Sequence, residues 1–255
     1  MKRILPTGSG PSRRRRRFSL VELLVVMGIM VMLLGLSFPT LERMAIGNGV
    51  DVGARMVTSQ LRLARQQALS NHKCIALLIP ASSTLSSNTK APILWYTAFR
   101  LCAVKYNGSA WVYDGGAFIL DNGADGTPGT SDDVTSGFFP GSNWDFLPIG
   151  AVILELNITP TYSGGTGSDM SDKGFLVKNV PIDVGTSTPA TIDCRAVIFK
   201  RTGTPAYDTG SAYIKVVQGV LPPDGSALRI TNEKNYLSIE LNPYTGKVTQ
   251  VLSGT

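Results

Sequence analysis

The sequence has little of what most catalytic and metal centres require. It contains one histidine, His72, so a zinc site built from several cysteine and histidine ligands cannot be assembled. The three cysteines, Cys74, Cys102 and Cys194, are too few and too widely spaced for a disulfide scaffold. One disulfide with one free thiol and three buried thiols are both compatible with this number. Charged residues make up only 16% of the chain and hydrophobic ones 43%, which excludes a disordered chain and provides for a packed core.

An excess of positive charge is missing from nearly the whole chain, although the formal net charge is +6. Seven of the 24 basic residues precede the first acidic one, Glu22, and these are Lys2, Arg3 and Arg13 to Arg17. The remainder has 17 basic residues and 18 acidic ones. Since DNA and RNA binding needs a basic surface that neutralises phosphates, we expect no nucleic acid partner.

Catalytic signatures are incomplete. No flanking motif accompanies His72 as the base of a Ser-His-Asp or Cys-His site. The sequence Asp-Thr-Gly-Ser at 208–211 matches the aspartic-protease loop, but it occurs once, whereas that chemistry needs two carboxylates that share a proton. The glycine-rich stretch 163–168 lacks the lysine of a phosphate-binding loop. We therefore expect no enzyme, and a tethered aspartic protease is retained only as an alternative.

A long apolar run is present near the N-terminus. Residues 23–38 carry no charge, and with residues 18–21 they reach about twenty residues, the length that crosses a bilayer. This predicts a transmembrane segment at about 20–40. The preceding arginines place the N-terminus in the cytoplasm and the rest across the membrane, as in a single-pass protein. No small-residue cleavage site follows Phe38, which disfavours a secretory or twin-arginine signal.

Glu22 lies inside this apolar segment. A carboxylate there costs about 2.5–3.5 kcal/mol on insertion scales, so it either snorkels to the interface or has a partner. The sequence Arg-Phe-Ser-Leu-Val-Glu-Leu-Leu-Val-Val at 17–26 resembles the prepilin-type cleavage and methylation motif of type IV pilins and type II secretion pseudopilins. Arg17 stands where that family almost always has glycine.

The resemblance implies a function and partners. A prepilin peptidase and methyltransferase would cut between Arg17 and Phe18 and methylate Phe18, Glu22 would neutralise the amine of a neighbouring subunit, and Pro39 would kink the helix. The chain would then be a structural subunit of a type II secretion pseudopilus or a type IV pilus-like filament, with other pilins or pseudopilins as partners. Before assembly it would be a single-pass protein of the inner membrane, with its C-terminal domain in the periplasm. A membrane-tethered binding or adhesion protein is the alternative.

The helix is predicted to continue beyond the apolar run. An apolar stripe with spacings of three and four predicts one helix over 18–70, about 80 Å long, with that stripe facing a core; its members are Val50, Ala54, Val57, Leu61, Ala64 and Ala68. Gly47, Gly49 and Gly53 predict local melting, since glycine costs about 1 kcal/mol in a helix interior.

The rest of the chain alternates with period two. Strands are predicted at 93–104, 150–156, 196–199, 212–217, 236–241 and 247–252, with turns at Asn107-Gly108 and at 242–246. The predicted fold class is α+β, a long N-terminal helix packed on an antiparallel β-sheet, as in pilins. The domains would be a basic leader 1–17, the helix 18–70, and a β-rich domain 71–255 with long loops at 121–141 and 159–173. Weaker resemblances favour a minor pseudopilin of the H class, at 64–71, 197–203 and 243–248.

An acidic, glycine-rich loop follows the first predicted strand. Calcium binds six to eight oxygens, and the stretch 121–133 supplies four carboxylates, those of Asp121, Asp125, Asp132 and Asp133. Asp125, Asp132 and Asp133 also resemble the calcium loop of major pseudopilins, which lies near the C-terminus in that family. No cofactor is required, and calcium is the candidate ion. A solvated acidic loop is the alternative reading.

Overall fold

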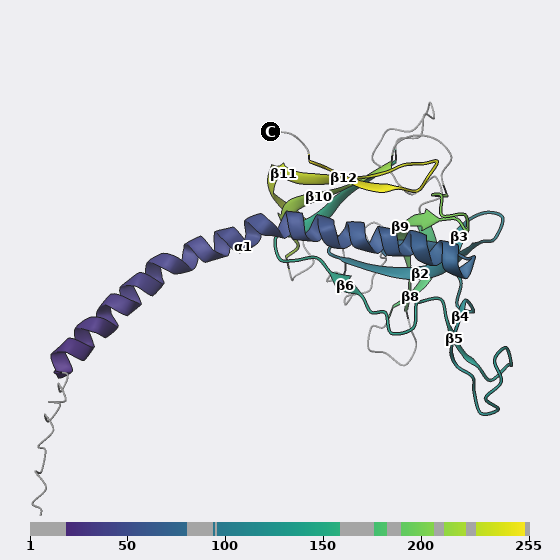
Figure 1. The fold of residues 1–255 in the computed structure, drawn as a ribbon, viewed down its shortest axis with the longest axis horizontal. Helices are drawn as coiled ribbons and strands as arrows, with labels where there is room; N and C mark the ends of the chain where they lie inside the picture. The colour runs from purple at the N-terminus through teal and green to yellow at the C-terminus, as the bar shows by residue number, and fades with distance from the viewer. Residues whose placement is uncertain are drawn as a thin grey trace, which may run out of the picture. The chain divides into compact units, whose positions relative to one another are not determined.

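The computed structural model describes residues 19–80, 94, 96–158, 176–182, 190–206, 212–222 and 228–252 (Figure 1). The predicted loop 159–173 and the stretches 163–168 and 208–211 lie outside these described residues. The chain divides into two compact units, Met1–Met44 and Ala45–Thr255. One helix, α1 (Leu20–Asn71), begins in the first unit and continues through the start of the second.

The second unit is mainly β. Each of the six predicted strands overlaps an observed one. The strands in the described residues are β1 (Cys74–Ile79), β2 (Ala98–Tyr106), β3 (Trp111–Tyr113), β4 (Phe118–Asp121), β5 (Val134–Ser136), β6 (Asp145–Phe146), β7 (Ala151–Ile158), β8 (Leu176–Ile182), β9 (Ala190–Phe199), β10 (Ala212–Val220), β11 (Arg229–Leu241) and β12 (Val248–Leu252).

Five strands close into a ring. They follow the order β1-β9-β8-β3-β2, and β1 also pairs with β2, while the short β6 pairs antiparallel with the start of β2. The pairing of β3 with β8 is parallel, through Trp111 opposite Val177 and Val112 opposite Lys178. A separate antiparallel sheet has the order β12-β11-β10-β7, and β4 and β5 form a hairpin of their own.

The predicted fold class is therefore wrong. The strands do not form one antiparallel sheet under a helix, but a closed ring with a parallel pairing, a second sheet and a hairpin. The predicted loop 121–141 also contains β5. The physical reason is that period-two alternation reports only which side chains share a face. It does not distinguish an open sheet from one whose first and last strands pair with each other.

The strand β1 separates two cores. Its side chains Ala76 and Leu78 belong to one buried cluster with Cys102 and Ile198, which is built from ring strands. The alternate side chains of β1 belong to a second cluster, which also contains residues of α1, β10, β11 and β12; they are Ile75, Leu77 and Ile79. Because both faces of β1 are buried, its sequence Cys-Ile-Ala-Leu-Leu-Ile shows no alternation of polar and apolar residues.

The second half of α1 packs as its stripe predicts. All six stripe residues are buried in the second core cluster, which confirms this prediction. The helix ends at Asn71, one residue from the expected position. His72 follows with φ of 52°, a left-handed conformation that ends helices.

The predicted transmembrane segment is contradicted. Within the described part of the chain, no helix combines the length and the apolar character needed to cross a membrane. The predictions of a transmembrane segment at about 20–40 and of a single-pass protein in the inner membrane are therefore wrong.

Two of the helix glycines have a packing role. In place of the predicted local melting, α1 is continuous through them. A Cβ at Gly49 would lie 2.7 Å from the backbone oxygen of Ile149, and one at Gly53 would lie 3.2 Å from the Cβ of Ala151. The missing side chains thus let α1 approach the segment that leads into β7.

Replacing Gly49 with alanine is expected to destabilise the protein. Alanine gains about 1 kcal/mol in helix propensity, but the clash with a backbone carbonyl should cost more, on the order of 1–3 kcal/mol for overpacking. Urea unfolding of the full chain measures the difference. Gly28→Ala is the matched control, because a Cβ at that position would have nothing within 4 Å of it. A Gly49→Ala variant at least as stable as the unmodified chain would refute the close contact.

Candidate functional sites

The first candidate site is the beginning of α1. Glu22 lies in the first helical turn and is exposed. The position suits a carboxylate, because the positive end of the helix dipole lies there. The neighbouring Leu23 amide donates to the Ser19 carbonyl at 3.1 Å. Arg17 and Phe18 lie outside the described residues, as does the side chain of Pro39, whose backbone is within α1.

Apolar side chains surround Glu22 on every side of the helix. Thirteen large ones in the first unit are between 46% and 80% exposed: Leu20, Val21, Leu23, Leu24, Val25, Val26, Met27, Ile29, Met30, Val31, Met32, Leu33 and Leu34. A helix that is apolar all round is normally buried in its functional state. Exposure of such a surface marks an interaction site.

The second candidate site is the acidic loop between β4 and β5. The Asp132 carboxylate accepts hydrogen bonds from the amides of Ala124 at 2.8 Å and Asp125 at 3.4 Å. The Thr130 hydroxyl donates to the same carboxylate at 2.7 Å. These hydrogen bonds lower the pKa of Asp132 below its ordinary value, and the bond from Thr130 has the largest effect. The carboxylate of Asp133 accepts in the same way from the amides of Gly129 and Thr130, at 2.6 and 3.1 Å.

The four carboxylates are thus not assembled around a common centre. Asp125 also accepts a hydrogen bond from within the loop, from the Thr127 amide at 2.8 Å. Among the described residues, no three Asp, Glu, His or Cys side chains form a group that could hold a metal ion. Backbone amides of the loop thus donate hydrogen bonds to the carboxylates of Asp125, Asp132 and Asp133. Calcium binding by Asp121, Asp125, Asp132 and Asp133 stays a prediction.

The hydrogen bonds of Asp132 predict a pH dependence of the loop. Because its pKa is lower in the folded loop than in an unfolded chain, where it is about 3.9, the charged form stabilises the loop above that pH. This stabilisation is lost as the pH falls through the folded pKa. The amide NMR signal of Ala124 should therefore be constant from pH 7 to 5 and shift only below about 4. An Asp132→Asn control should show no such transition, and a wild-type midpoint at or above 3.9 would contradict the lowered pKa.

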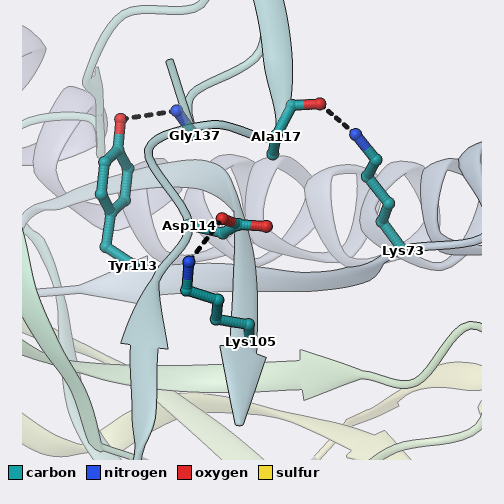
Figure 2. A network of polar contacts seen from close by, with 6 residues as sticks. All are labelled: Lys73, Lys105, Tyr113, Asp114, Ala117 and Gly137. Atoms are coloured by element: carbon teal, nitrogen blue, oxygen red, sulfur yellow. Dashed lines mark hydrogen bonds and ion pairs between the residues drawn. The ribbon is translucent and has the colours of Figure 1, made fainter. Parts of the chain in front are cut away.

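Hydrogen bonds connect the base of the hairpin β4–β5 to the neighbouring elements. Figure 2 shows the contacts: the Gly137 amide donates to the Tyr113 hydroxyl at 2.8 Å, and Lys73 donates to the Ala117 carbonyl. Nearby, Lys105 pairs with Asp114 at 3.1 Å. A Cβ on Gly137 would lie 2.5 Å from the Asp114 carbonyl oxygen, so only glycine fits.

These contacts at the base of the hairpin were not predicted from the sequence. Lys73 follows α1, Tyr113 lies on β3, and both Ala117 and Gly137 flank the hairpin β4–β5. The segments meet because β2 pairs with β3 and because Ala103 of β2 donates its amide to the Gly137 carbonyl at 2.7 Å. No local pattern pairs residues this far apart.

Three segments that carried the weaker family resemblance come together at the end of α1. Arg65 donates to the Gly203 carbonyl at 3.2 Å, and a Cβ on Gly203 would contact the Leu69 side chain at 2.9 Å. A Cβ on Gly246 would collide with the same Gly203 carbonyl. The helix end and the turns after β9 and β11 therefore form one tightly packed junction.

The cysteines are three thiols. None of Cys74, Cys102 and Cys194 is in a disulfide in the described structure, and the last two are buried in the ring cluster. Burial raises the pKa of both buried thiols, which keeps them protonated and unreactive.

The candidate sites are therefore the apolar start of α1 with Glu22 and the acidic hairpin β4–β5. In the comparisons with known proteins, no family model, curated protein or solved structure matches this chain.

Proposed function

We propose that this protein is a structural subunit of a pilin-like filament, a minor pilin or pseudopilin, that assembles through the beginning of α1. The observation that carries the proposal is the exposed apolar surface from Leu20 to Leu34, which runs around the whole helix. We propose that the helices of further subunits bury this surface, since burial of apolar surface is favourable by about 25 cal/mol of free energy per Å².

Glu22 is the reason to prefer an ordered assembly over nonspecific association. A carboxylate inside an apolar helix bundle must find a positive partner, because an unpaired buried charge is strongly destabilising. The amine of a processed Phe18 on a neighbouring subunit is the partner we propose. One charged pair in an otherwise apolar bundle would set the register between subunits, as single polar residues do in coiled coils.

Processing is the direct test of this proposal. We expect the chain isolated from its source cells to begin at Phe18 with a methylated amine, and intact-mass spectrometry with N-terminal peptide sequencing measures this. The seven basic residues of the leader would be lost with the cleavage. A mature chain that begins at Met1, or beyond Pro39, would reject the filament assignment, the second outcome because it removes Glu22 and the apolar run.

Assembly is the second measurement. The full chain should form sedimenting polymers visible by negative-stain electron microscopy. A chain that begins at Ala45 should form no such polymers, because it lacks the exposed apolar side chains of the first unit. Equal behaviour of the two chains would reject α1 as the assembly element.

A further inference from the structure

The outward face of α1 in the second unit carries two rows of side chains. Val52 and Leu63 are 45% and 39% exposed and lie three turns apart, so they share a face. Arg55 and Arg62, two turns apart, form a neighbouring exposed row, and Arg62 also donates a hydrogen bond to the Val248 carbonyl at 3.4 Å. Arg55 pairs with Asp51 at 3.0 Å, but both side chains are largely exposed. Such pairs contribute less than about 1 kcal/mol, so Arg55 can exchange this partner for another carboxylate.

The hairpin β4–β5 has the complementary composition. Ile119, Leu120 and Val134 are 40–53% exposed. Residues 118–136 contain four aspartates and no lysine or arginine. Figure 1 shows this hairpin projecting from the rest of the second unit, and its base is held by Lys73 and Tyr113. It therefore presents apolar and acidic side chains on a preorganised arm.

Val52 and the hairpin lie far apart within one copy. Lys73 holds the base of the hairpin just beyond the end of α1, whereas Val52 precedes Asn71 by 19 residues, about 29 Å of helix, and Leu63 precedes it by 8 residues, about 12 Å. A contact of the hairpin with Val52 then joins different copies through two different surfaces. Contacts of this heterologous kind propagate into open-ended chains when they do not close a ring.

We propose that the hairpin β4–β5 of one copy docks on the Val52–Leu63 face of α1 in the next copy. The inference rests on the proposed function and specifies one contact of the filament. Charge complementarity carries it: the hairpin carries four negative charges, of which Asp125, Asp132 and Asp133 also accept hydrogen bonds within the loop. The α1 face supplies Arg55 and Arg62 beside apolar side chains that match Ile119, Leu120 and Val134. Complementary charge steers the encounter and fixes the register, and apolar contact retains the partner.

Disulfide crosslinking of the full chain tests this contact. In a Cys74→Ser background, which leaves only the two buried thiols, Val52→Cys and Val134→Cys are combined in one chain and oxidised with diamide. We expect a ladder of dimers and larger species on non-reducing gels. A mixture of the two single variants should stop at dimers, because each copy then offers one reactive surface. Val52→Cys combined with Thr249→Cys, an exposed position on β12, is the control that should give no ladder.

Charge reversal gives an independent measurement. Arg55→Glu should lower the crosslinking yield several-fold, and Asp121→Lys in the same chain should restore part of it. Polymers that form without a ladder would overturn the docking contact and leave the proposed function standing. A chain that stays monomeric would reject both. Dimers from Val52→Cys alone, or a yield unchanged by Arg55→Glu, would replace this contact with a different interface.

Discussion

A chain that begins at Ala45 is expected to fold, whereas one that begins at His72 is expected to remain unfolded. The difference is the second half of α1, which contributes six fully buried side chains to the larger core cluster. Burial of Val50, Val57 and Leu61 alone is worth about 1.5–3 kcal/mol for each side chain. The sum approaches the whole stability of an ordinary domain, about 5–15 kcal/mol. The strands alone would expose the other side of that core to water.

Circular dichroism and urea unfolding of the two truncated chains measure this difference. Leu61→Ala in the chain from Ala45 is the graded test, since it keeps the helix and should cost about 2–5 kcal/mol. Leu63→Ala is its matched control, because Leu63 lies on the exposed face. Cooperative unfolding of the chain from His72 at the same urea concentration as the longer chain would show that α1 is not part of the folding unit.

Replacing Glu22 with leucine is expected to abolish incorporation into filaments without affecting the fold. The side chain is exposed in the first unit, so the variant loses no intramolecular packing. In the proposed assembly, however, the Phe18 amine of the neighbour would lose its partner. Leaving a buried charge unpaired costs about 3–5 kcal/mol. A cost of about 3 kcal/mol corresponds to an incorporation at least about 100-fold lower.

The measurement is copurification of a tagged variant with filaments of the untagged wild type, next to a thermal unfolding curve of each protein. Glu22→Asp keeps the charge and should retain part of the incorporation, while Val25→Leu controls for a change in apolar packing. Were Glu22→Leu to copurify as well as wild type, the carboxylate would have no partner in the assembly. The proposed role of the helix would then lose its main physical support.

Local physical chemistry explains which features sequence reasoning found. The stripe on α1 repeats every three to four residues within one continuous segment, so its burial follows from the geometry of a single helix. The turn after β11 forms because the Asn242 side chain accepts hydrogen bonds from the amides of Tyr244 and Thr245 at 3.0 and 2.9 Å. Asn107 does the same for Ser109 and Ala110 after β2. In each case the partners are within a few residues.

The candidate sites, too, are only partly predictable from local sequence. Glu22 and the apolar run around it are visible in sequence, because a single charge among apolar residues is itself the signal. The acidic residues of the 121–133 loop are visible too, but their hydrogen bonds with the loop's own amides are not. Whether a carboxylate faces a metal or an amide depends on backbone conformation, here on glycines with positive φ such as Gly123 and Gly126.

The helix, its buried stripe, the turns and the apolar segment near the N-terminus can therefore be predicted from local sequence. The closure of β1, β9, β8, β3 and β2 into a ring, the burial of both faces of β1, and the contacts that require Gly49 and Gly137 are seen only in the folded structure. The reason is the range of the interactions. Helix periodicity and turn chemistry act between residues a few positions apart, whereas ring closure and backbone contacts join segments that only the folded chain brings together.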